Sequence, residues 1–214
     1  MTKSILVIGA GKGVSHAVAR EFGKQGFQVG LLGRNPEKLN ALKEELEHDG
    51  IYTKCFQGDV GEEESLRTAL QKVKLEFDSI DIIHYNAASP RSLNILEETS
   101  TALVADFKVN VIGLLVSAQE LLPELEKAKG AILVTGGGFA IYPHPDFGSL
   151  SIGKAGLRNL SESLAQALRS KGIYLGIVSI LGMVSPDDSV HNPQNIAAKF
   201  WSIYQSRQEL EFRL

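Results

Sequence analysis

Apolar positions along this chain follow two periods, which predict an alternation of strands and helices. Short apolar, often β-branched runs predict strands at residues 4–8, 27–32, 52–57, 80–84, 130–135 and 173–180, with a last short strand at 209–214. Apolar residues three or four positions apart predict helices that begin at Val14 and Pro36 and that span residues 66–77, 101–122, 150–170 and 194–205. This alternation is typical of an α/β fold, a doubly wound parallel sheet with helices on both faces. Residues 1–214 are expected to form a single domain.

A glycine cluster links the first expected strand to the first expected helix. Gly9, Gly11 and Gly13 follow the apolar run 4–8, and the helical pattern starts at once with Val14. Such a turn lets the backbone approach a ligand, and a helix N-terminus offers free N–H groups and a positive dipole end to a pyrophosphate. The pattern predicts a Rossmann-like dinucleotide site. The alternative is a tight turn without a ligand.

Ligands of doubly wound sheets lie at the carboxyl ends of the strands, so the residues after each strand are the candidates for binding. The second strand ends in Gly33-Arg34, where a dinucleotide fold often has an acid for the ribose 2′-hydroxyl. Arg34 and Lys12 together favour a 2′-phosphate, and hence NADP(H) over NAD(H). The alternative is that both are solvated surface cations. The following Asn35-Pro36 is expected to cap the next helix.

Composition excludes several classes of function. The 214 residues carry a net charge of −3 without a basic stripe, so no nucleic-acid partner is expected. The single cysteine, Cys55, rules out an intramolecular disulfide and fits a reducing compartment. The longest apolar stretch, Val109 to Ala118, is too short to span a bilayer. A cytoplasmic protein without a membrane segment and without a metal site is predicted.

Taken in order, these motifs resemble those of the short-chain dehydrogenase/reductase family over essentially the whole chain. The glycine motif of that family resembles Gly9 to Ser15, with Ser15 in place of a third glycine. Asp59-Val60 matches the pair at the adenine, and Asn86-Ala87-Ala88 resembles the motif of the fourth strand, preceded by Tyr85. The resemblance implies hydride transfer between a nicotinamide and a carbonyl or alcohol substrate. The cofactor-binding residues that this interpretation selects are Gly9, Gly11, Lys12, Gly13, Val14, Arg34, Asn35, Asp59, Val60, Asn86, Ala87, Lys154, Gly182 and Val184.

The catalytic set of that family is only half present. Asn110 matches the helix asparagine and Lys154 the active-site lysine. The family's catalytic tyrosine stands four residues before the lysine, where this chain has Leu150, and its serine corresponds to Gly137. The loss of a general acid commonly lowers a rate about 10²- to 10⁴-fold.

Other groups of the same segment are candidates for the missing acid. His144 has an ordinary pKa near neutrality, and Tyr142 stands close to it in sequence, although a loop histidine and an edge-packing aromatic are the alternatives. Ser149 or Ser151 is expected to cap the long helix. Backbone N–H groups of Gly136 to Gly138 are a further candidate, against simple close approach of the backbone to the cofactor.

Two functions therefore remain open at this point. One is an NADP(H)-dependent oxidoreductase with a degenerate active site, and the other is a non-catalytic NADP(H)-binding sensor or interaction protein. A plain structural module is a third, less favoured by the intact glycine turn. The helices at 101–122 and 150–170 carry more apolar surface than one sheet face covers, which predicts a homodimer or tetramer through them.

Overall fold

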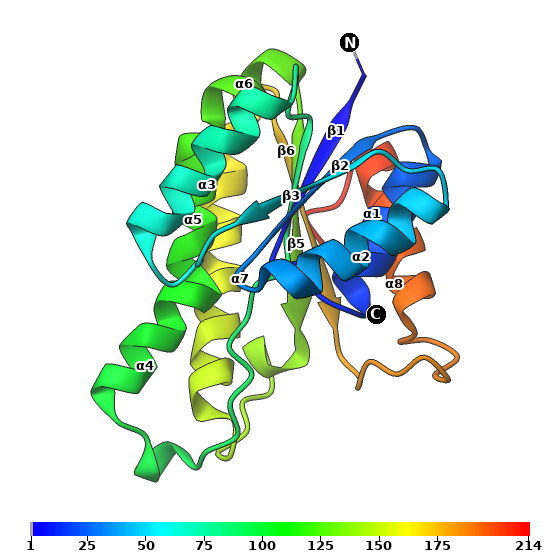
Figure 1. Cartoon of the computed structure of the whole chain (residues 1–214). Coiled ribbons are helices and arrows are strands. Elements are labelled where there is room, and N and C mark those ends of the chain that lie inside the picture. The colour runs from blue at the N-terminus through cyan, green and yellow to red at the C-terminus, as the bar shows by residue number, and fades with distance from the viewer. Residues whose placement is uncertain (1) are drawn as a thin grey trace.

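Parallel strands build one seven-stranded sheet in the computed structural model, which describes residues 2–214 (Figure 1). The order across the sheet is β3-β2-β1-β4-β5-β6-β7. Neighbouring strands pair in parallel throughout, so each link between them crosses over one face of the sheet. The strands are β1 (Ser4–Ile8), β2 (Gln28–Gly33), β3 (Thr53–Gln57), β4 (Ile82–Tyr85), β5 (Ala131–Gly137), β6 (Tyr174–Ile180) and β7 (Glu211–Arg213). The predicted doubly wound fold is confirmed.

Helices cover both faces of the sheet (Figure 1). One face carries α1 (Val14–Lys24), α2 (Pro36–His48) and α8 (Pro193–Ser206), and the other carries α3 (Glu63–Glu76), α5 (Gly113–Glu120) and α7 (Gly148–Arg169). Two hydrophobic cores result, because successive side chains of a strand point to opposite faces. In β1, Leu6 and Ile8 belong to the core under α3, α5 and α7, whereas Ile5 and Val7 belong to the core under α1, α2 and α8.

The expected helix at 101–122 differs from the observed one. It consists of α4 (Ser100–Phe107), a π-helical segment (Lys108–Ile112) and α5, and the chain then turns at Leu121 into α6 (Leu122–Ala128). The apolar periodicity that predicted one regular helix continues through the π-helical segment, so the sequence pattern gave no sign of the change. The segment carries Asn110, one of the residues that the family resemblance selects.

The same helical run extends well beyond Val109 to Ala118, the apolar stretch from which its length was judged. Ser100–Glu120 has 21 residues and a mean hydropathy of 1.6, which by length and composition is enough to cross a membrane, and the expectation that no stretch could do so was wrong on this criterion. It is the one such helix among residues 2–214. Buried core helices meet the same criterion, and this run packs against α3 and α7 on one face of the sheet. A cytoplasmic location stays a prediction.

Candidate functional site

The turn between β1 and α1 takes a shape that depends on two glycines. Gly9 and Gly13 have φ values of 81° and 98°, in the left-handed region that other residues rarely adopt. A Cβ at Gly9 would lie 2.5 Å from backbone atoms of Ala87, so glycine lets the ends of β1 and β4 meet. A Cβ at Gly11 or Gly13 would face open space. The turn is therefore an open cradle at its ligand-facing side.

The N-terminus of α1 is free to receive an anion. Its N-cap residue is Gly13, and among the described residues no side chain caps the helix. Ser15, which replaces the usual third glycine, is buried and folds back onto the turn: its hydroxyl accepts from Gly11 N and donates to Gly11 O, both at 2.9 Å. The serine thus fixes the turn without blocking the first N–H groups of the helix.

A cleft of about 380 Å³ opens beside this turn at the carboxyl edge of the sheet. It gathers residues that follow four different strands, as the sequence predicted for Gly9, Arg34, Asp59 and Asn86. The lining is Gly9, Ala10, Gly33, Arg34, Gly58, Asp59, Val60, Asn86, Ala87, Ala88, Pro90 and Val109. One Asp59 carboxylate oxygen accepts from Gly61 N at 2.9 Å, which orients the side chain and leaves its second oxygen without a hydrogen bond from residues 2–214.

A second hollow adjoins the first and is rich in cations. Lys12, Arg34 and Lys38 line it together with Asn35, against the single acid Glu37. Lys12 and Arg34 are exposed, and neither forms an ion pair within residues 2–214. Lys38 was not among the cofactor-binding residues selected from the sequence. Its position in the first turn of the helix that starts at Pro36, close to Arg34, could have indicated it. Two unpaired cations beside the cleft suit a phosphate.

Asn35 has a structural task at this position. Its side-chain oxygen accepts from Lys38 N at 3.0 Å, with Pro36 at the first helical position, so the predicted cap of α2 is confirmed. Only its amide nitrogen remains available to a ligand.

The π-helical segment holds Asn110 against the end of β4. Asn110 is buried, and its side-chain oxygen accepts from Ser89 N at 2.8 Å. Tyr85, which precedes Asn86, donates its hydroxyl to Val109 O at 2.5 Å, and its ring tip fills the space that a Cβ at Gly113 would need. Burial raises the pKa of the Tyr85 hydroxyl far above its ordinary value, so this phenol stays protonated. Tyr85 therefore packs against the segment with its hydroxyl hydrogen committed to Val109 O.

Lys154 projects from α7 to the carboxyl end of β5. Its Nζ donates to Thr135 O at 2.8 Å, and among residues 2–214 it has no other hydrogen bond and no ion pair. Burial lowers the pKa of Lys154 to about 8. A Cβ at Gly137 would lie 3.7 Å from Lys154 Cε, an ordinary contact, so the glycine leaves one side of the lysine stem uncovered.

Leu150, which the resemblance places at the position of the family's tyrosine, is a shielded leucine. Leu150 is 9% exposed, yet it belongs to neither of the two hydrophobic cores. It stands one turn before Lys154 in α7, on the same side of the helix. No hydroxyl comes from Leu150 or from Gly137.

The two candidate acids of the loop before α7 are directed to solvent. Tyr142 is 69% exposed, so it does not pack at an edge as one alternative expected. His144 is exposed as well, and its Nδ1 accepts from Asp146 N at 3.2 Å. Its ring packs beside Phe147, 5.7 Å between centroids. The loop-histidine alternative fits this geometry better than a catalytic role.

The predicted serine cap of α7 was wrong. The N-cap residue is Phe147, without a side-chain cap. Ser151 donates to Phe147 O at 2.9 Å and accepts from His144 N at 3.2 Å, so it ties the loop to the helix. Ser149 instead donates to Asp106 at 2.6 Å, because a carboxylate of α4 lies across from the start of α7.

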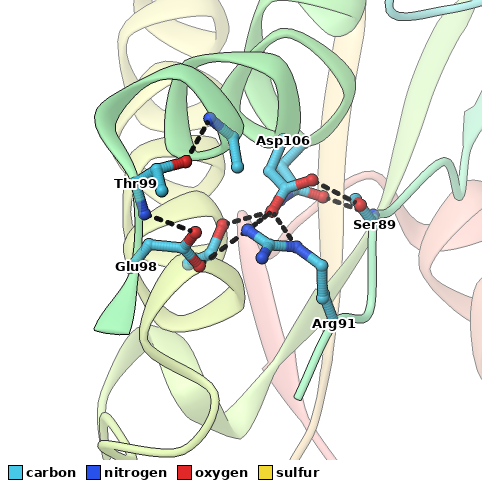
Figure 2. A network of polar contacts seen from close by, with 8 residues as sticks. Ser89, Arg91, Glu98, Thr99 and Asp106 are labelled. Atoms are coloured by element: carbon cyan, nitrogen blue, oxygen red, sulfur yellow. Dashed lines mark hydrogen bonds and ion pairs between the residues drawn. The ribbon is translucent and has the colours of Figure 1, made fainter. Parts of the chain in front are cut away.

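Asp106 is the centre of a polar network that sequence reasoning missed (Figure 2). Its carboxylate accepts from Ser89 at 2.6 Å and from Ser149 at 2.6 Å, and Arg91 adds bonds of 2.8 and 3.2 Å. Arg91 also reaches Glu98 at 2.6 Å. The network joins the segment after β4, the residue Glu98 just before α4, the last turn of α4 and the start of α7. A signal existed, since Asp106 is the only acid between Glu98 and Glu120 in an apolar helix.

In the segment after β6, the ring of His191 packs against Gly182. A Cβ at Gly182 would overlap the ring of His191, whose Nδ1 lies 3.3 Å from an Asp188 oxygen. Val184 is 39% exposed. Both Gly182 and Val184 follow the carboxyl end of β6, at the same edge of the sheet as the cleft, but neither lines that cleft.

Comparison with known proteins agrees with this geometry. The family model of the short chain dehydrogenases matches residues 3–193. The oxidoreductase asL5 of Sarocladium schorii is 30% identical over 178 residues, which cover 83% of this chain and 70% of that protein. A metagenomic short-chain oxidoreductase in complex with NADP superposes with a TM-score of 0.87 at 22% identity, covering 100% of this chain and 96% of that chain.

A second solved structure has a still closer overall shape. The L-sorbose reductase from Gluconobacter frateurii, complexed with NADPH and L-sorbose, gives a TM-score of 0.91 at 18% identity and covers 100% of this chain and 95% of its own. At these identities the two structures support the fold, and the match to the family model extends over most of the sequence. The chain therefore belongs to the short-chain dehydrogenase family.

Proposed function

We propose that this protein is an NADP(H)-dependent oxidoreductase with an altered proton-transfer site, acting on a carbonyl or alcohol substrate. The observation that carries the proposal is the pair of unpaired cations, Lys12 and Arg34, that lines the hollow beside the glycine cradle. A 2′-phosphate in that hollow would neutralise both, and Arg34 has the geometry for a bidentate contact. Residues 1–214 then make up one nucleotide-binding domain.

The cradle itself fits a dinucleotide. Gly11 and Gly13 leave open space where side chains would stand, and the uncapped first turn of α1 offers N–H groups to the pyrophosphate. Asp59 keeps one carboxylate oxygen for the adenine amino group. Lys154 and Asn86 are expected to hold the nicotinamide end, and Gly182 and Val184 its carboxamide. When bound, NADPH supplies a hydride to a carbonyl carbon, and NADP⁺ accepts one from an alcohol carbon.

Coenzyme titration tests the cofactor part of the proposal. Nicotinamide fluorescence is measured against NADPH and NADH for the wild type, Arg34→Ala and Lys12→Ala, with Lys127→Ala as a matched control on the exposed side of α6. Loss of Arg34 is expected to weaken NADPH binding by about 10- to 100-fold and to leave NADH binding unchanged. Equal weakening of both coenzymes, or no NADPH binding by the wild type, would contradict the proposal.

A non-catalytic NADP(H)-binding protein is the second candidate. It is favoured by Leu150 and Gly137, which remove both hydroxyls of the family's catalytic set. NADPH consumption with a panel of aldehydes, ketones and quinones separates the two functions. Turnover by the wild type excludes the non-catalytic candidate.

We also propose that two copies associate through α4, α5 and α7. Val104 on α4 and Ile152 on α7 are 58% and 41% exposed, and the two helices pack side by side. Burial of such side chains against a second copy would remove apolar surface from water.

A further inference from the structure

Reduction of a carbonyl group requires a proton donor for its oxygen, and few side chains near Leu150 and Gly137 can act as that donor. Tyr142 is largely exposed, and His144 sits in the loop with Nδ1 occupied by the Asp146 amide. Tyr85 is buried, donates to Val109 O and stays protonated at any working pH. Ser149 is 3% exposed and gives its only hydrogen to Asp106. Each of these groups is either turned to solvent or already committed.

Lys154 differs from them in having free donors at the carboxyl end of the sheet. An ammonium group has three N–H bonds, and here Thr135 O takes one at 2.8 Å. Within residues 2–214 no carboxylate lies within ion-pair distance of Nζ. Because Gly137 has no side chain, no hydroxyl stands between the lysine stem and the end of β5 on that side.

The groups that face Lys154 are uncharged. On β5 they are Thr135 and Gly137, and on the π-helical segment Asn110 packs against Gly153, the residue before Lys154. His84 on β4 touches the Thr135 hydroxyl at 3.1 Å, and burial lowers the pKa of His84 to about 3, so it is neutral. Asp106 is held by Ser149, Ser89 and Arg91. Burial therefore acts on the Lys154 ammonium without an opposing acid, and its pKa falls to about 8.

We propose that Lys154 is itself the proton donor of this site in reduction and the proton acceptor in oxidation. This inference rests on the proposed function. In reduction, with a hydride delivered to the carbonyl carbon, the C=O π pair would form the new O–H bond with a proton from Lys154 Nζ, and the N–H bonding pair would stay on the nitrogen. The neutral amine then regains a proton from water. Positioning of a ribose, the role that the family resemblance implies for this lysine, uses the remaining N–H group.

The test separates charge from proton release. Lys154→Arg keeps the cation and the donor to Thr135 O, but its guanidinium does not release a proton near neutrality. Lys154→Met removes both. Lys127→Arg serves as the control for a lysine change at the surface, and His144→Gln tests the competing acid. NADPH affinity, carbonyl reduction from pH 6 to 9.5, and the Lys154 pKa from ¹³Cε-lysine NMR of the protein alone are measured.

The proposal expects a reductive kcat that falls above about pH 8 in the wild type, with the same midpoint in the NMR titration. Lys154→Arg should bind NADPH within a few-fold of the wild type and lose about 10²- to 10⁴-fold in kcat. His144→Gln and Lys127→Arg should keep the wild-type pH profile. A lysine midpoint above pH 10, or a Lys154→Arg enzyme within threefold of the wild-type kcat, overturns the proposal.

Failure of the underlying function gives a different result. If the wild type binds no NADPH, the proposed function is refuted and the lysine proposal with it. If NADPH binds but no carbonyl of the panel is reduced at any pH, cofactor binding stands and Lys154 is refuted as a proton donor.

Discussion

Replacement of Asp106 by asparagine tests whether the network in Figure 2 holds the catalytic half of the site together. The Asp106 side chain is 10% exposed and receives two short hydroxyl bonds, from Ser89 and Ser149. Ser89 N in turn binds Asn110, and Ser149 directly precedes Leu150. The carboxylate thus connects α4 to both segments that carry the proposed catalytic positions.

The expected cost follows from these contacts. Hydrogen bonds to a charged group stabilise a fold by about 1.5–3 kcal/mol each. Asparagine keeps one acceptor oxygen, and its amide can donate to a serine hydroxyl that rotates, so about one charged bond is lost. Asp106→Asn should therefore lower the free energy of unfolding by about 2 kcal/mol. For a chain of this length that corresponds to a fall in Tm of roughly 4–8 °C.

The pH dependence of that loss provides a sharper test. Burial alone would raise the pKa of Asp106. The hydrogen bonds from Ser149 and Ser89 and the bonds and charge of Arg91 together lower the pKa by more than burial raises it, so the net pKa lies below its ordinary value. A depressed carboxyl pKa stabilises the fold above the unfolded pKa of about 3.9, and the stabilisation disappears as pH falls through the folded value. The difference between wild type and Asp106→Asn should be complete at pH 7 and shrink below about pH 4.

Thermal unfolding followed by circular dichroism at several pH values measures this difference, with Asp78→Asn as a control at an exposed acid. The reasoning is refuted if Asp106→Asn unfolds within 1 °C of the wild type at pH 7. It is refuted equally if the difference is the same at pH 7 and pH 3, because the carboxylate charge would then contribute nothing.

Three further predictions concern the cradle, the catalytic positions and the assembly. Gly9→Ala should destabilise the fold by about 2–4 kcal/mol in chemical denaturation, since its Cβ would meet the Ala87 backbone at a φ of 81°; a neutral result would contradict the close approach. Gly137→Ser with Leu150→Tyr should raise carbonyl reduction by about 10²-fold without loss of Tm, because Gly137 is extended and a Cβ there makes ordinary contacts; an unchanged rate would mean that the two hydroxyls are not what limits turnover. Ile152→Glu should convert the expected dimer to monomer in sedimentation velocity, and a dimeric variant would place the contact elsewhere.

The sequence was sufficient to predict the fold because the apolar pattern of its strands differs clearly from the apolar pattern of its helices. Strands such as β1 are short, continuous and apolar, and both faces of the sheet are covered, so the residue pattern needs no knowledge of distant contacts. The cap at Asn35 was predictable for the same reason, since both of its partners are local. Local chemistry decided these elements.

Most of the missed features depend on contacts between segments distant in sequence. The π-helical segment receives a hydrogen bond from the Tyr85 hydroxyl, 24 residues before Val109. Ser149 prefers Asp106, 43 residues away, to the helix end that local rules assign to it. An isolated acid in an apolar helix signals a buried partner, but its identity requires the packed structure.

The two halves of the site rest on different parts of the chain. The glycine cradle of the proposed cofactor site is built from backbone, and it accommodates Ser15 because the serine hydroxyl bonds to Gly11 N and Gly11 O of the turn. The proposed catalytic half depends on side chains, so Leu150 and Gly137 would change its chemistry directly.

Leu150 is more than the absence of a tyrosine. It precedes Lys154 by one helical turn on the same side of α7 and is 9% exposed, so it contributes apolar surface there. A tyrosine hydroxyl at this position would be a polar neighbour, and polar neighbours reduce the desolvation that lowers the pKa of an ammonium group. On the proposal that Lys154 is the proton donor, an apolar side chain at position 150 favours release of a proton by the lysine, because desolvation is what lowers the pKa of Lys154. One residue, Leu150, would then account both for the missing tyrosine hydroxyl and for part of the lowered pKa of the lysine.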